Sequence, residues 1–228
     1  MPALEQILFP NTFGMELTYS FVIIFCSLMI YFSTKKMYDI SKHTGIKYFR
    51  DSFLFFAIAY FFKSFIDFLL LLLGLHEVLE FDSFSIGILT LFIFMYASTM
   101  AIFYLFYSVM WKNFKEKNFV VPIVHIFVLI ISAVLIETRY VAFLLILQIM
   151  IFGFITLYNY IVLRKSKNKK KVGPLYAVYL FLFAFWILNL IDLLIEGFDP
   201  VLELVVSMVS IGLFLIISYK VMRSMGPD

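Results

Sequence analysis

One segment decides the class of this chain: residues 140–171, YVAFLLILQIMIFGFITLYNYIVLRKSKNKKK. Its first 24 residues contain no charged side chain, and six of the last eight are Lys or Arg. A helix of about 20 apolar residues crosses the hydrocarbon core of a bilayer, which is roughly 30 Å thick. Short loops rich in Lys and Arg remain on the cytoplasmic side. The segment therefore predicts a transmembrane helix that ends in the cytoplasm.

The same pattern recurs along the chain and predicts an all-α, polytopic membrane protein. Hydrophobic residues make up 64% of the sequence and charged residues 14%, compared with about 25% charged in soluble domains. No stretch shows the period-two alternation of a membrane β-barrel. We expect a seven-transmembrane-helix bundle that forms a single transmembrane domain over residues 1–228. The predicted spans are 16–33, 53–75, 86–111, 119–136, 140–163, 175–195 and 202–222.

The connections between the spans alternate in charge, and this alternation predicts the orientation. Basic residues gather after spans one, three, five and seven, as in the RKSKNKKK cluster of Arg164–Lys171. The other connections are acidic, and Arg139 is their only basic residue. We therefore expect the amino terminus outside and the carboxyl terminus in the cytoplasm. The expected location is the cell (cytoplasmic) membrane, which the protein crosses several times.

Two halves of the chain carry matching residues. With Asp67 aligned on Asp192, five residues recur: Phe56, Ala59, Ile66, Asp67 and Leu69 match Phe181, Ala184, Ile191, Asp192 and Leu194. The match suggests a 3+1+3 arrangement of parallel repeats, a known design in membrane bundles. Chance matching in a sequence rich in Phe and Leu is the alternative.

The second span carries the first group of candidate site residues. Tyr60, Lys63 and Asp67 lie three and four residues apart, so they share one face of a helix. Lys63 lies about 15 Å from the cytoplasmic end of its span, deep in the bilayer. An ionisable residue at that depth is costly and normally faces the interior of a bundle. Lys63 and Asp67 form either a structural ion pair or part of a binding site.

The sixth span adds Asn189 and Asp192 on one face. If Asp192 shares a cavity with Lys63 and Asp67, two acids meet one base. The remaining negative charge must then be neutralised by a proton, a bound cation or water, because burial disfavours a charged carboxylate. Alternatively, Asp192 faces a wet outer vestibule. Gln148 in span five is a candidate for extending this polar seam, and Trp186 for packing, contacting lipid or lining an apolar pocket.

Enzyme, metal and cofactor chemistry lack the residues they need, so we expect none of them. His43 and His76 fall in loops on opposite sides, which leaves His125 alone within the membrane. Cys26 has no activating base nearby in the sequence. Topology and attraction to anionic lipid headgroups account for the basic loops, so we expect no nucleic-acid partner.

The topology resembles that of the microbial rhodopsins, which hold retinal on a lysine in the middle of the last helix. Here span seven carries only Lys220, at its cytoplasmic end, and residues 211–215 are apolar. The resemblance is therefore one of architecture. A 3+1+3 bundle also resembles the small sugar and vitamin facilitators. Those proteins commonly hinge at prolines within their spans, whereas here only Pro122 lies inside a span.

Three functions remain open from the sequence. The first is a receptor-like or sensory bundle that binds a small apolar or cationic ligand in its outer half and relays to a cytoplasmic partner. The second is a facilitator or proton-coupled transporter of a small solute. The third is a structural subunit of a membrane complex. The expected partners are the lipid bilayer, a small-molecule, cation or lipid ligand, and a cytoplasmic or membrane protein.

Overall fold

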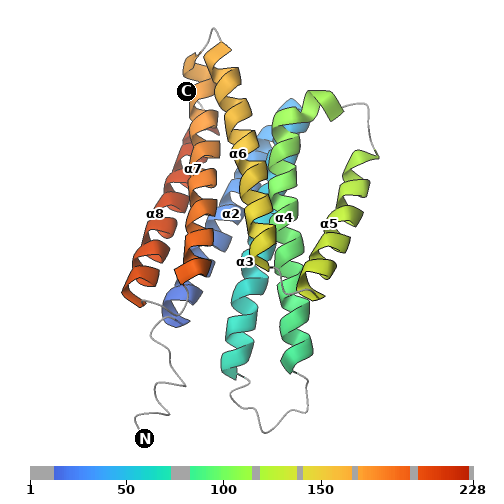
Figure 1. The fold of residues 1–228 in the computed structure, drawn as a ribbon. Helices are drawn as coiled ribbons and strands as arrows, with labels where there is room; N and C mark the ends of the chain where they lie inside the picture. The colour runs from blue at the N-terminus through green and yellow to red at the C-terminus, as the bar shows by residue number, and fades with distance from the viewer. Residues whose placement is uncertain are drawn as a thin grey trace, which may run out of the picture.

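The computed structural model describes residues 13–72, 83–114, 119–137, 141–165, 169–195 and 200–225, and these residues form seven helices (Figure 1). The helices are α2 (Phe13–Ser41), α3 (Thr44–Leu72), α4 (Ser83–Phe114), α5 (Val120–Glu137), α6 (Val141–Lys165), α7 (Lys169–Ile195) and α8 (Pro200–Met225). The described part of the chain contains no strand. The predicted all-α, seven-helix fold is confirmed.

Length and composition make this bundle a multi-pass membrane protein. Five helices, α2, α4, α6, α7 and α8, are long and apolar enough to cross a bilayer. Helix α5 is apolar but shorter, and α3 carries Lys47, Arg50, Asp51 and Lys63 among its described side chains. Large apolar side chains cover the outer faces, for example Phe21 and Met150, each 67% exposed. Such a surface is suited to lipid rather than to water.

The first two helices meet at a very short turn. The sequence predicts a long connection over residues 34–52, but α2 continues to Ser41 and α3 begins at Thr44. Lys42 takes a positive φ of 51° and its amide donates to the Tyr38 carbonyl, which ends α2. His43 caps the start of α3, because its Nδ1 accepts the Gly45 amide at 3.1 Å. The basic residues of this region therefore extend both helices beyond the predicted spans.

Six helices form a closed ring, in the order α2, α3, α4, α6, α7, α8 and back to α2. Each helix packs against its two neighbours in that order. Helix α5 stands outside the ring, where it packs mainly against α4 and only slightly against α6 (Figure 1). The helix in the middle of the sequence is thus the peripheral one.

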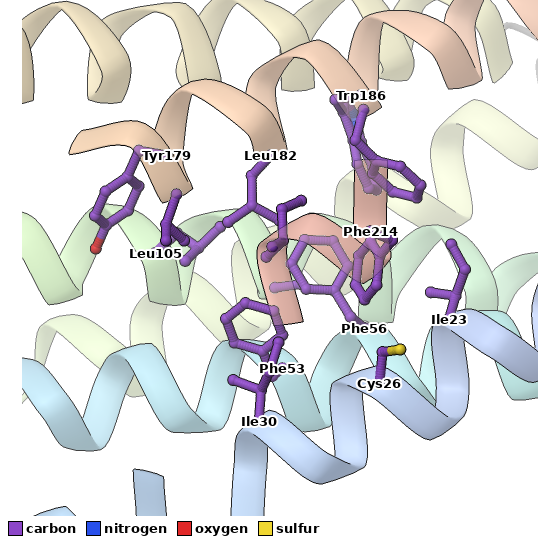
Figure 2. Packing of buried hydrophobic residues seen from close by; sticks show 14 of the residues in the cluster. Ile23, Cys26, Ile30, Phe53, Phe56, Leu105, Tyr179, Leu182, Trp186 and Phe214 are labelled. Carbon is purple, nitrogen blue, oxygen red and sulfur yellow. The ribbon is translucent and has the colours of Figure 1, made fainter. Parts of the chain in front are cut away.

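Aromatic and aliphatic side chains from the ring helices fill its interior. Phe53 and Phe56 of α3 meet Trp186 of α7 and Phe214 of α8, and all four are almost completely buried. Figure 2 shows these side chains together with Ile23, Cys26 and Ile30 of α2. Close packing of this kind leaves few voids and fixes the neighbouring helices relative to one another.

Candidate functional site

A hydrogen-bonded cluster of polar side chains joins the predicted outer ends of α2 and α7 to the middle of α3. The Tyr60 hydroxyl donates to Asn189 Oδ1 at 2.7 Å, and the Tyr19 hydroxyl donates to the same oxygen at 3.1 Å. The two hydroxyl oxygens lie 3.3 Å apart. Both tyrosines are buried, with exposed fractions of 4% for Tyr19 and 1% for Tyr60. We call Tyr19, Tyr60 and Asn189 the outer cluster.

The Asn189 amide is oriented by its own helix. Its Nδ2 donates to the Phe185 carbonyl one turn earlier at 2.9 Å, which aims Oδ1 at the two hydroxyls. The Phe185 ring then packs against both tyrosines, with centroids 6.5 Å from Tyr19 and 6.1 Å from Tyr60. One carbonyl oxygen thereby serves two buried donors on two other helices, as buried polar groups require.

Two charged residues flank the outer cluster. Lys63 Nζ lies 5.7 Å from the centroid of the Tyr19 ring, within the range of a cation–π contact. Asp192, one turn beyond Asn189, interacts electrostatically with the hydroxyls of both tyrosines. Ser210 of α8 also interacts with the Tyr19 hydroxyl. The outer cluster and the residues that flank it thus combine hydroxyl groups, aromatic faces, one acid and one base.

The predicted partnership of Lys63 with Asp67 stays a prediction. The backbone of Asp67 belongs to α3, but its side chain lies outside the described residues. The structure does bring Tyr60 and Asn189 into direct contact and places Lys63 and Asp192 around them.

Gln148 and Trp186, the other two predicted site residues, belong to a separate cluster between α4, α6 and α7. Gln148 is fully buried and donates to Thr99 at 2.8 Å and to Ser98 at 3.2 Å. Trp186 Nε1 donates to Gln148 Oε1 at 3.0 Å. Trp186 is only 1% exposed, so it does not face lipid. We call these four residues the inner cluster; all four side chains are hydrogen-bonded, which indicates a structural link.

His125 holds the peripheral helix to the ring. Its Nδ1 is 2.6 Å from the Tyr96 hydroxyl and its Nε2 is 3.1 Å from the Tyr104 hydroxyl, both on α4. Phe55 of α3 completes the contact, with its ring centroid 6.0 Å from the imidazole. The position agrees with a hydrogen-bonded structural histidine. Among the described residues no group of three or more His, Cys, Asp or Glu side chains could hold a metal ion.

Tyr19 is the site residue that the sequence does not identify. It lies at the start of a span in a chain with fourteen tyrosines, and no spacing pattern singles it out. Its role depends on the closure of the ring, which places α2 beside α3 and α8. Thr18, Tyr19 and Ser20 form a short polar run at the start of a mainly apolar span, and this run is the available signal.

The geometry defines the class of protein: a multi-pass membrane protein whose described residues form seven helices. It is similar to an uncharacterized protein from Archaeoglobus fulgidus, with 28% identity over 218 residues that cover 92% of each chain. No protein-family model matches the chain. No solved structure matches it either. The sequence similarity extends over nearly the whole chain, and it assigns no activity to the protein.

Proposed function

We propose that the protein is a receptor-like or sensory bundle that binds a small cationic ligand at the outer cluster and relays the event to its cytoplasmic end. One observation carries the proposal: the buried hydroxyls of Tyr19 and Tyr60 share Asn189, with the carboxylate of Asp192 close by. Aromatic faces and a carboxylate are the groups that recognise organic cations. The Lys63 ammonium lies over the face of Tyr19, so it would compete with a bound cation for that ring.

The packing beneath the outer cluster favours a receptor over a channel. Phe56, Phe185, Trp186 and Phe214 pack against one another directly below it and are buried. A solute moving inward from the cluster would have to displace this layer. A ligand bound above the layer can instead shift the helices that contribute to it, and an equilibrium shifts by the ligand's differential affinity for the two arrangements.

The relay would run through α2 and α3. Both helices contribute a tyrosine to the outer cluster and both continue without a break to the turn at Lys42. Near that turn Arg50 bonds to Asp51 at 2.7 Å and lies over the rings of Tyr31 and Tyr38. Exposed lysines at the same end, Lys35 and Lys36, offer a contact surface for a cytoplasmic partner.

Thermal unfolding in detergent tests the ligand site, with tetramethylammonium, choline, sodium and potassium as probes. A ligand at 100 times its dissociation constant stabilises the folded state by about 2.7 kcal/mol. We expect such a rise for an organic cation in the wild type and its loss in Asp192→Asn. Lys63→Gln should bind the same cation more tightly, because the competing ammonium is gone. Asp39→Asn, the same chemical change at an exposed residue near the turn, should respond like the wild type.

Flat unfolding curves with all four probes in the wild type would contradict the proposal. So would a response that Asp192→Asn retains in full, because the carboxylate would then play no part in binding.

The order of the helices also favours a second function, a facilitator or proton-coupled carrier. A ring of α2–α3–α4 and α6–α7–α8 with α5 outside is the arrangement that a 3+1+3 repeat requires. Uptake of labelled amines into liposomes separates the two functions. Saturable uptake that Asp192→Asn abolishes would support the carrier, and binding without uptake would support the receptor.

A further inference from the structure

A lipid-facing groove lies between α4 and α6, away from the outer cluster. Six apolar residues line it: Phe103 and Phe106 of α4, and Leu147, Met150, Ile151 and Phe154 of α6. Its volume is about 380 Å³, within the range of roughly 300–1,000 Å³ typical of small-ligand sites. Met150 and Phe154 are 67% and 52% exposed, so the groove opens toward the surroundings of the bundle.

The helices that form the groove end in basic residues on the same side. Lys112 lies in the last turn of α4, and Arg164 and Lys165 lie in the last turn of α6. All three side chains are exposed. At 1.5 Å per residue, Lys112 is about 9 Å beyond Phe106 and Arg164 about 15 Å beyond Phe154. The apolar groove and these positive charges thus lie along the same two helices, with the charges toward the ends of both.

The position of α5 leaves the groove accessible. Helix α5 packs mainly against α4 and only slightly against α6, and its first turns stand apart from α6 (Figure 1). The side chains that α5 turns outward are apolar, among them Ile123 and Phe127. Because Met150 and Phe154 of the groove are themselves exposed, a flexible chain from the bilayer can reach the groove.

We infer that this groove holds one acyl chain of an anionic phospholipid, with its phosphate bound by Lys112, Arg164 and Lys165. The apolar lining suits a hydrocarbon chain, and the basic residues complement a negatively charged headgroup. A second copy of the chain fits less well. Two copies facing each other across this groove would bring the same basic residues together, and like charges repel.

The test uses the full-length protein, delipidated in detergent and titrated with phosphatidylglycerol or phosphatidylcholine of identical acyl chains. Native mass spectrometry counts the bound lipids, and thermal unfolding gives the affinity. We expect the wild type to bind one phosphatidylglycerol in preference to phosphatidylcholine. The triple variant Lys112→Gln/Arg164→Gln/Lys165→Gln should weaken phosphatidylglycerol binding about tenfold or more, since each basic residue near an anionic surface contributes measurably.

Two further variants keep the test specific. Met150→Trp, which fills the groove from its exposed side, should weaken binding of both lipids. The triple variant Lys35→Gln/Lys36→Gln/Lys47→Gln removes the same charge from other exposed positions and should bind phosphatidylglycerol like the wild type. Equal loss in both triple variants, equal affinity for the two lipids, or a change of oligomeric state in Met150→Trp without loss of lipid would overturn the inference.

Discussion

At the scale of single residues, Asn189 is the residue on which the hydrogen bonds of the outer cluster depend. Its amide oxygen accepts from Tyr19 and Tyr60 while its amide nitrogen stays on its own helix. A buried hydroxyl that loses its acceptor costs about 1–3 kcal/mol, more than the net value of the bond itself. The Asn189 amide oxygen therefore links three helices. A substitution that removes this oxygen measures how much the link contributes to the free energy of unfolding.

Asn189→Leu should lower the free energy of unfolding by about 1–3 kcal/mol, because two buried hydroxyls lose their acceptor. In a Tyr19→Phe/Tyr60→Phe background the same change should cost much less, because no hydroxyl remains to be satisfied. Chemical unfolding in detergent micelles measures the four proteins of this cycle. Equal costs in both backgrounds would show that Asn189 acts through packing.

Gln148→Leu should likewise destabilise the protein by about 1–3 kcal/mol, because Trp186 loses its acceptor and Ser98 and Thr99 lose a donor. Asn159→Leu is the matched control. Asn159 is also a buried amide on α6, but among the described residues its side chain bonds only to the Ile155 carbonyl of its own helix. Unfolding followed by tryptophan fluorescence measures both variants, and an equal loss in the two would contradict the link between helices.

The sequence predicts Tyr60, Lys63, Asn189 and Asp192 as site residues because polar groups are rare in these spans and costly in lipid. It does not predict Tyr19, nor the division of the polar residues into two clusters. In a membrane the lipid is as apolar as the protein core, so hydrophobicity does not determine which face of a helix packs against its neighbours. Apolar residues therefore surround each helix, and the buried face cannot be identified from periodicity.

At the scale of elements, the close packing of the turn between α2 and α3 depends on Gly45, the second residue of α3. A Cβ at this position would lie 3.0 Å from the Ser108 carbonyl oxygen, from Trp111 Cδ1 and from His43 Cε1. The glycine lets α3 begin directly against the end of α4. His43 and Trp111 also pack edge to face, with centroids 4.5 Å apart. This contact replaces the long connection that the sequence predicts, because charged residues can extend a helix beyond the hydrocarbon core.

Gly45→Ala should destabilise the protein by about 1–3 kcal/mol and alter the Trp111 fluorescence, because the Ser108 carbonyl belongs to the backbone and cannot move freely. Gly212→Ala is the opposite case. In the described part of the chain, no atom outside the backbone of α8 lies within 4 Å of its Cβ position, so the change should stabilise the helix by about 0.5–1 kcal/mol. Melting temperatures of both variants check the pair; stabilisation by Gly45→Ala would show that the turn packs more loosely.

At the scale of the whole molecule, the number and type of helices follow from the lengths of the apolar segments. The ring order and the peripheral place of α5 do not, because they depend on contacts between helices far apart in sequence. The orientation in the membrane stays a prediction from the charged loops.

Cysteine labelling on intact cells tests the orientation. The single natural cysteine, Cys26, is buried and is replaced by alanine for this experiment. A membrane-impermeant maleimide should label Thr138→Cys, in a predicted outer connection, and should reach Ser166→Cys only after the cells are opened. The reverse pattern would invert the predicted topology.

The short turn at Lys42–His43 has a mechanical consequence. Two helices of 29 residues each, joined with almost no slack, form a rigid lever about 43 Å long. A tilt of about 3° over that length displaces one end of the pair by about 2 Å relative to the other. A small rearrangement at the outer cluster should therefore reach the turn at Lys42–His43 with a comparable amplitude, because neither helix is interrupted between the two.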